Sequence, residues 1–311
     1  MIEEIAISAS DLSKSYGRKK ALDGTSIDIR SGKIHVLLGR NGSGKTTLVK
    51  ILAGILDPDS GRVSRDSSFR RQTGFLFDSS SHWDALTGHE NAWFFARAYG
   101  LDKHAADERI RTLFKELALE EVGDDRVSSY SFGMRRKLAL VEALAHDPSL
   151  IVLDEPSIGL DFASRTSLYS LLRKRADDGK AVVIATNDMN EAMHLADTVS
   201  LMESGRVLAT GAPDDLVKSL GQEIMMRALV KAWPPLDRIR SVPGVVDASV
   251  LETKDGLSLS VMVKLDQEEA AVVEIMKSLA SRSVGISRLD IRRPDLGDVF
   301  LRFAEGGVSE A

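Results

Sequence analysis

Short, nearly continuous apolar runs recur along the first two thirds of the chain and predict buried strands. The clearest runs are 34–38, 150–153 and 180–186, each bounded by glycine, proline or polar residues. Runs of this kind are typical of strands that are covered on both faces. Other strand candidates are 5–12, 25–30, 61–63, 74–77 and a hairpin formed by 198–202 and 206–209.

Helical periodicity occurs between these runs. From 107 to 119, the apolar residues Ile110, Leu113, Phe114 and Leu117 have the spacing of one helical face. An aromatic-rich segment at 89–99 is a second helix candidate. These segments predict a helical insert within a chain of alternating strands and helices, which is the pattern of the α/β class.

The pattern changes after about residue 220. Following a rigid break at 233–235, apolar and polar residues alternate from 257 to 265, which predicts a half-buried strand. An amphipathic helix is expected at 272–279 and a last strand at 287–291. We therefore predict two domains: 1–220, with a helical subdomain at about 79–146, and a small α+β domain at 221–311.

A glycine-rich loop directly follows the apolar run at 34–38. It fits the phosphate-loop pattern G-x-x-x-x-G-K-[ST], and the helical segment after it must stop before Pro58. Backbone N–H groups and the helix dipole can bind phosphates there, Lys45 can reach the β- and γ-phosphates, and Thr46 can ligate Mg²⁺. A glycine turn without a ligand is the alternative, but a turn needs neither Lys45 nor Thr46. The loop residues are Gly39, Arg40, Asn41, Gly42, Ser43, Gly44, Lys45, Thr46 and Thr47.

Two carboxylates, Asp154 and Glu155, end the apolar run at 150–153. Carboxylates at the end of a buried strand are costly unless they serve a metal or a proton transfer. Open α/β sheets also bind ligands at the carboxyl ends of their strands. An acidic surface turn is the alternative at this position. Ser131 can be a simple helix N-cap, and Tyr16 can either stack on a base or be an ordinary aromatic residue.

Composition and charge restrict the possible partners and chemistry. The formal net charge of -5 gives no general attraction to nucleic acid, and the absence of cysteine excludes disulfides, thiol catalysis and Cys-ligated zinc. The basic clusters 70–71, 135–137 and 173–175 are interpreted as solvated helix faces. No apolar run is long enough for a membrane span, and the N-terminus lacks the apolar region of a signal peptide.

Together these features resemble the ATP-binding subunit of ABC transporters over residues 5–220. The order of motifs is specific for that family: Tyr16, the loop at 39–47, the helical insert, a signature at 130–134, Asp154 and Glu155, Gly159 to Asp161, and a switch at 187. The stretch at 292–301 is similar to the C-terminal domain of drug-resistance and sodium-export ATPases of the ABC-2 type. The resemblance implies an α/β phosphate-loop nucleotide-binding domain with a mixed sheet and helical insert, followed by a small α+β domain.

The resemblance also implies roles for individual residues, with ATP and Mg²⁺ as cofactors. Tyr16 would stack on adenine, Asp154 would hold Mg²⁺, and Glu155 would polarise the attacking water. Ser131 and the Gly133 N–H would contact the γ-phosphate of ATP bound to a second ATP-binding subunit, as a homodimer or a heterodimer. A separate transmembrane permease would dock beside the insert, around 79–105. The expected location is cytoplasmic, peripheral at the cytoplasmic face of the cell membrane.

Three positions depart from the family pattern. Asp78 stands where Gln or Glu usually faces Mg²⁺ and the lytic water, Phe132 stands where Gly is common, and Asn187 stands where the switch is usually His. An Asn amide can donate a hydrogen bond but cannot carry positive charge. The lead hypothesis is therefore an export ATPase that is slow because of Asn187, in which Glu155, Asn187 and Asp78 are catalytic and Asp78 also faces the metal.

Two alternatives remain at this point. The first is a degenerate, slowly hydrolysing or non-hydrolysing nucleotide-gated subunit that pairs with another ATPase; the retained Glu155 argues against it. The second is an ABC protein that acts on DNA or the ribosome. The short insert without sustained heptads, the single cassette and the negative charge argue against that class, so no nucleic-acid partner is expected.

Overall fold

The computed structural model describes residues 4–65, 73–77, 82–219, 223–254, 256–292 and 295–306. The chain divides into two compact units, Met1–Pro213 and Asp214–Ala311. No helix in these described ranges combines the length and apolar character needed to cross a membrane.

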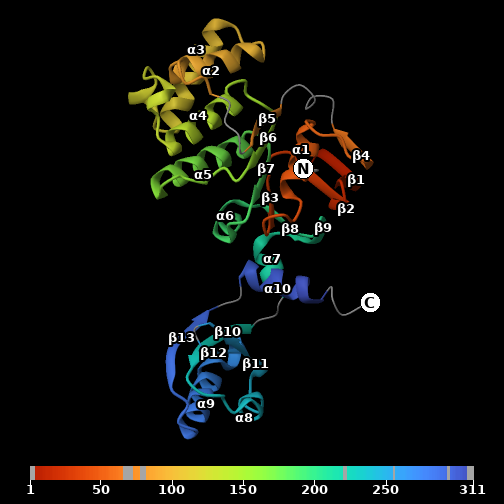
Figure 1. Ribbon diagram of the computed structural model, residues 1–311, viewed down its shortest axis with the longest axis vertical. Coiled ribbons are helices and arrows are strands. Elements are labelled where there is room, and N and C mark those ends of the chain that lie inside the picture. Colours follow the sequence, from red (N-terminus) through yellow and green to blue (C-terminus); the bar gives the residue numbers. More distant parts are fainter. Residues whose placement is uncertain are drawn as a thin grey trace. The chain divides into compact units, whose positions relative to one another are not determined.

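A six-stranded sheet forms the centre of the first unit (Figure 1). Its strand order is β5-β6-β7-β3-β8-β9, in which neighbours pair in parallel except for the antiparallel pair of β8 and β9. The predicted runs in β3, β6 and β7 are buried along their whole length, because both faces of the sheet are covered. The strands are β3 (Ile34–Gly39), β5 (Thr73–Leu76), β6 (Leu150–Asp154), β7 (Ala181–Thr186), β8 (Thr198–Glu203) and β9 (Arg206–Gly211).

A three-stranded antiparallel sheet, with the order β2-β1-β4, lies beside the first. Its strands are β1 (Ile5–Tyr16), β2 (Lys19–Arg30) and β4 (Ser60–Arg65). The first two strands are longer than predicted, because register shifts along the pair and a positive φ of 52° at Asp11 interrupt the apolar alternation without ending the ladder. As a result, Tyr16 lies at the end of a strand, directly before the turn at Gly17.

Helices cover both faces of the six-stranded sheet (Figure 1). The helix α1 (Lys45–Ala53) packs between the two sheets, where its buried residues join one apolar core with β1, β2, β3, β6 and β7. The helices α5 (Phe162–Asp177) and α6 (Met189–Leu195) contact β3 and β7. The strands β3 and β6, which carry Gly39 and Asp154, are thus covered on both faces.

The helical insert consists of α2 (Gly88–Ala98), α3 (Lys103–Glu116) and α4 (Phe132–Leu144). Thr87 and Glu90 form a complete capping box at the start of α2. Ile110, Leu113 and Phe114 are buried on one face of α3, as the periodicity predicts. The insert connects the end of β5 to the start of β6.

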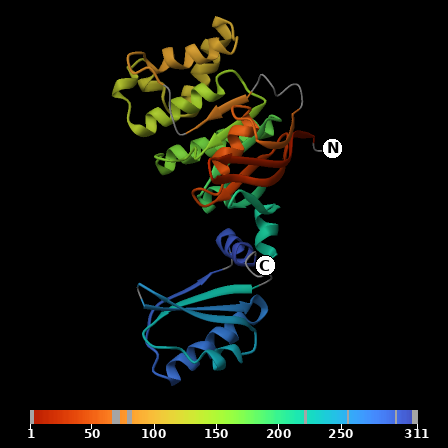
Figure 2. The same cartoon turned by 45° about the vertical axis from the view of Figure 1, so that its right-hand side comes forward.

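The second unit has the order β-α-β-β-α-β after the short helix α7 (Pro213–Lys218), and its strand order β11-β12-β10-β13 is the ferredoxin-like arrangement. Both helices α8 and α9 pack on one face of the sheet (Figure 2). The alternating segment forms β12, with Leu259, Val261 and Val263 fully buried. The α/β and α+β classes are therefore confirmed, although β10, β11, α8 and α10 were not predicted. The elements are β10 (Glu223–Val230), α8 (Leu236–Arg240), β11 (Val245–Thr253), β12 (Gly256–Lys264), α9 (Glu268–Ser281), β13 (Ile286–Arg292) and α10 (Leu296–Gly306).

Candidate nucleotide-binding site

The glycine loop connects the end of β3 to the start of α1. Gly44 caps the helix with φ 106°, a left-handed conformation that glycine adopts without strain. Gly39 allows a close approach, because a Cβ at this position would lie 2.3 Å from the carbonyl oxygen of Met202. The two glycines therefore allow a tight loop whose backbone passes directly into a helix N-terminus, as phosphate binding requires.

The Lys45 side chain is buried at the base of this loop, with 5% of the residue exposed. Its Nζ donates to the carbonyl oxygens of Gly39 at 2.8 Å and Arg40 at 3.1 Å. Burial lowers the pKa of the amine, while the nearby carboxylates of Glu155 and Asp154 oppose that shift. Since neutral carbonyls are its hydrogen-bond acceptors, the ammonium group is available to an anionic ligand.

Thr46 and Asp154 meet across the loop and the neighbouring strand. The Thr46 hydroxyl donates to Asp154 Oδ2 at 2.7 Å, whereas Asp154 Oδ1 is buried and has no hydrogen-bond partner among the described residues. Burial raises the pKa of the Asp154 carboxyl, and the Thr46 bond partly offsets this. A hydroxyl and a carboxylate oxygen beside a phosphate loop fit Mg²⁺, which takes few protein ligands together with phosphate oxygens and water. The described ranges hold no group of three or more His, Asp or Glu residues that could bind a metal.

Glu155 lies directly after β6 in an unusual backbone conformation. Its φ is 48°, and its N–H donates to the carbonyl of Ala185 at 2.8 Å, which fixes the turn against β7. Burial raises the pKa of its carboxyl, while Lys45 opposes the shift. A half-buried carboxylate with a raised pKa has the properties of a general base.

Asn187 follows β7 at the same edge of the sheet and is exposed. Its Nδ2 donates to Asn41 Oδ1 in the glycine loop at 3.2 Å. The switch position and the phosphate loop are thus joined by one hydrogen bond between two amides.

These residues line a single cavity of about 610 Å³. Ten of the predicted site residues take part: Tyr16, Asn41, Gly42, Gly44, Lys45, Thr46, Thr47, Asp154, Glu155 and Asn187. Gly39, Arg40 and Ser43 belong to the same loop but are not among the lining residues. The predicted Asp78 lies outside the described residues.

Four lining residues, Lys19, Ala21, Lys50 and Ile158, were not predicted. Lys19 has a signal in the sequence, because the turn at Gly17 pairs it with Tyr16 across the hairpin. Its Nζ lies 3.7 Å from the position that a Cβ on Gly42 would occupy, so its charge is above the phosphate loop.

The signature residues lie apart from this cavity, at the start of α4. Ser131 caps the helix by accepting from the Met134 N–H at 3.2 Å, which confirms the N-cap. A Cβ on Gly133 would lie 3.1 Å from the Gly159 carbonyl, and a Cβ on Gly159 would lie 2.2 Å from the Phe132 ring. The segment after Glu155 therefore packs closely on the signature.

Arg136 corrects an interpretation of the sequence. The cluster 135–137 was assigned to a solvated face, but Arg136 is 7% exposed and donates to the carbonyl oxygens of Asp154 and Glu155, both at 2.6 Å. It also reaches the carbonyl of Phe77 at 3.3 Å. Arg175 in the cluster 173–175 is likewise buried and pairs with Glu116 at 3.0 Å. The solvated-face interpretation is wrong for both arginines, because their partners come from distant segments.

The sequence and the fold are similar to those of known proteins. The family model described as "ABC transporter" matches residues 22–158. The daunorubicin resistance ATP-binding protein DrrA2 of Streptomyces coeruleorubidus is 32% identical over 305 residues, covering 96% of this chain and 94% of the relative. The linearmycin resistance ATP-binding protein LnrL of Bacillus subtilis is 27% identical over 305 residues, covering 95% and 97%.

Solved structures agree with the sequence relatives. An ATP-binding subunit of an ABC transporter superimposes with a TM-score of 0.65 at 27% identity, covering 70% of this chain and 93% of its own. MJ0796, a bacterial ABC transporter cassette whose structure is dimeric, gives a TM-score of 0.61 at 25% identity, covering 66% and 98%. The chain therefore belongs to the ABC transporter family, among the ATP-binding proteins of the ABC-2 exporter group.

Proposed function

We propose that this chain hydrolyses ATP with Mg²⁺ and thereby powers a separate membrane permease of an exporter. The observation that supports this most directly is the convergence of Tyr16, the phosphate loop, the Thr46–Asp154 contact and Glu155 on one cavity. The relatives' names describe ATP-binding proteins of resistance and export, which favours an exporter and gives no support to a non-hydrolysing subunit.

In this proposal the chain's own residues bind and orient the nucleotide. Tyr16 stacks on the adenine, the loop N–H groups and Lys45 bind the phosphates, and Thr46 and Asp154 hold Mg²⁺. Mg²⁺, when bound, supplies neutralisation of the phosphate charge. Glu155 orients a water for attack on the γ-phosphate and accepts its proton, a role that the raised pKa of its carboxyl suits.

Asn187 makes the proposed hydrolysis slow. Its amide can donate to the γ-phosphate but supplies no charge, so the transition state is stabilised less than it would be by a protonated His. The contact with Asn41 supports this role, because it shows that the Asn187 side chain reaches the phosphate loop.

Two chains would close head to tail over two ATP molecules, so that Ser131 and Gly133 contact the γ-phosphate on the partner chain. Ser131 and Gly133 are absent from the cavity lining, as this arrangement requires, and MJ0796 has a dimeric structure. Homodimer and heterodimer both fit this geometry.

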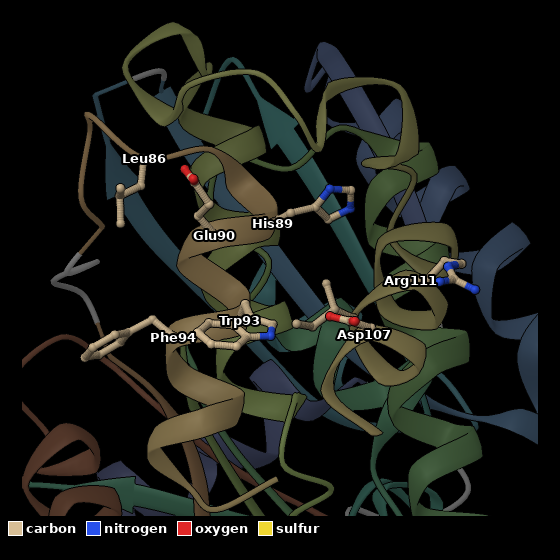
Figure 3. Close-up of a pocket in the computed structure, with 8 residues that line it drawn as sticks. Leu86, His89, Glu90, Trp93, Phe94, Asp107 and Arg111 are labelled. Carbon is tan, nitrogen blue, oxygen red and sulfur yellow. The ribbon is translucent and has the colours of Figure 1, made fainter. Parts of the chain in front are cut away.

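The proposed permease contact lies on the helical insert. A cavity of about 540 Å³ is lined by α2 and α3, and Trp93 and Phe94 are 40% and 48% exposed beside it. In Figure 3 the Trp93 ring points from α2 toward α3, near Asp107, whereas Phe94 points away. An apolar cytoplasmic segment of the permease would complement the aromatic rings. Because Glu90, Asp107 and Arg111 also line the cavity, such a segment would meet side chains of both charges. This contact would place the chain at the cytoplasmic face of the membrane.

Steady-state ATP turnover tests the proposal when wild type and Glu155→Gln are compared, with Mg²⁺ and with nucleotide binding measured on both. We expect wild type to turn over and Glu155→Gln to bind ATP but to lose turnover by about 10²-fold or more. Binding without hydrolysis by the wild type would overturn the proposed ATPase activity.

A further inference from the structure

The segment 82–86, which begins the helical insert, is joined to the signature region at several points. The N–H groups of Val127 and Ser128 donate to the carbonyls of Leu86 and Asp84, at 2.9 Å and 3.1 Å. Arg135 on α4 pairs with the Asp84 carboxylate at 2.6 Å on the solvent side. These contacts connect the segment to both sides of Ser131.

The same segment also lies beside the proposed permease groove. Trp83 stacks edge-on against Phe94, with ring centroids 4.6 Å apart, and Leu86 lines the cavity between α2 and α3. The backbone of Trp83 is held by the fully buried Asn91 side chain. Asn91 accepts from the Trp83 backbone N–H at 2.9 Å and donates to the Trp83 carbonyl oxygen at 3.1 Å. A displacement in the groove therefore acts directly on the segment.

The buried end of the segment is His82, whose side chain is 1% exposed. Its Nε2 lies 3.0 Å from the carbonyl oxygen of Arg135, and its Nδ1 lies 3.0 Å from Glu142 Oε1 on α4. A carbonyl oxygen can only accept, so Nε2 carries a hydrogen and donates it. The tautomer follows from this geometry.

The contact between His82 Nδ1 and Glu142 Oε1 then needs a proton in addition to the hydrogen on Nε2. Either Nδ1–H donates to the Glu142 carboxylate, or a protonated Glu142 donates to the Nδ1 lone pair. Burial raises the pKa of the Glu142 carboxyl, while the hydrogen bond from His82 opposes this. Without that proton, two acceptors would face each other at 3.0 Å inside the protein, which is costly.

We propose that His82 and Glu142 are positioning residues that share one buried proton and thereby fix segment 82–86 to α4, so that a displacement of the groove reaches Ser131. The inference rests on the proposed function for the source of the displacement, the permease. The connection between segment 82–86 and α4, called the joint below, depends only on the contacts of the His82 and Glu142 side chains.

Hydrogen–deuterium exchange at residues 126–131, which include the Val127 and Ser128 amides, tests the joint in the full chain. Glu142→Ala removes the contact and is expected to speed exchange there by about tenfold. Glu142→Asp keeps the carboxyl group but shortens the side chain, so it should speed exchange as well. Glu142→Gln should match the wild type, because its amide N–H can donate to Nδ1 of a neutral His82. Glu108→Ala, an exposed glutamate on α3, is the matched control and should change nothing.

Turnover and ATP binding are measured on the same variants. We expect Glu142→Ala to lower kcat with an unchanged Kd for ATP, and Glu142→Gln to restore kcat, because the nucleotide cavity is untouched. A wild type without turnover would refute the proposed ATPase, yet the exchange data would still decide on the joint. The proposal is wrong if Glu142→Ala leaves exchange at 126–131 unchanged, or if Glu142→Gln is as fast as Glu142→Ala.

Discussion

Carboxylates with little solvent exposure occur in both units of the chain, but their surroundings differ. In the first unit Asp154 has one oxygen hydrogen-bonded to Thr46, and its other oxygen is buried without a partner in the part of the chain that the structure describes. In the second unit Asp298 accepts from Arg292 at 2.8 Å and 3.0 Å and from the Asp295 N–H at 3.0 Å. Arg227 reaches the same carboxylate at 3.4 Å. The first carboxylate can still bind a ligand, whereas the second is fully used by the fold.

This difference gives the conspicuous tail sequence a structural role. Asp295 caps α10 by accepting from the Gly297 and Asp298 N–H groups, and Asp298 bonds back to the Asp295 N–H as in a capping box. Arg292 links this cap to the end of β13. A motif that resembles a family signature can therefore stabilise a helix start without contributing chemistry.

Of the variants that test this difference, Asn187→His is expected to have the largest effect, on ATP turnover. It adds a positive charge to the nucleotide cavity beside Asp154. A protonated His can stabilise the transition state better than the Asn amide, so turnover should rise by about tenfold or more. Steady-state hydrolysis with saturating Mg²⁺ and ATP measures this. Asn187→Ala is the control and should lower turnover without weakening ATP binding. An unchanged rate in Asn187→His would show that Asn187 does not limit hydrolysis.

Much of the nucleotide cavity in the first unit could be predicted from the sequence, because most of its residues belong to short contiguous motifs. The glycine loop and Asp154–Glu155 end buried apolar strands, and parallel strands bring their carboxyl ends to one edge. Arg136 was missed because its acceptors are backbone carbonyls from distant segments, which no side-chain pattern records. The strand β10 was missed because it forms by antiparallel pairing with β12 and β13, which lie later in the chain.

Asp298→Ala should lower the stability of the second unit and leave the nucleotide cavity of the first unit unchanged. Removing the carboxylate leaves the Asp295 N–H without this acceptor and leaves Arg292 with only the Asp295 carboxylate among its described partners. We expect a loss of about 1–3 kcal/mol in the unfolding free energy of the second unit. Denaturant unfolding measures the loss, and ATP binding should be unchanged. Asp290→Ala, an exposed aspartate on β13, is the matched control. Equal stability of the two variants would contradict the role assigned to the Asp295–Asp298 cap.

The smallest effect is expected from Lys19→Ala. This variant tests whether a residue outside the sequence motifs contributes to nucleotide binding. Lys19 is exposed and pairs with Tyr16 across the hairpin, so its charge adds to phosphate binding through solvent-screened attraction. We expect the Kd for ATP to rise about two- to fivefold, with less change at high salt. Lys20→Ala, whose amine pairs instead with Asp23, is the matched control. If both variants bind ATP like the wild type, the phosphate site is confined to the loop at 39–47 and to Asp154.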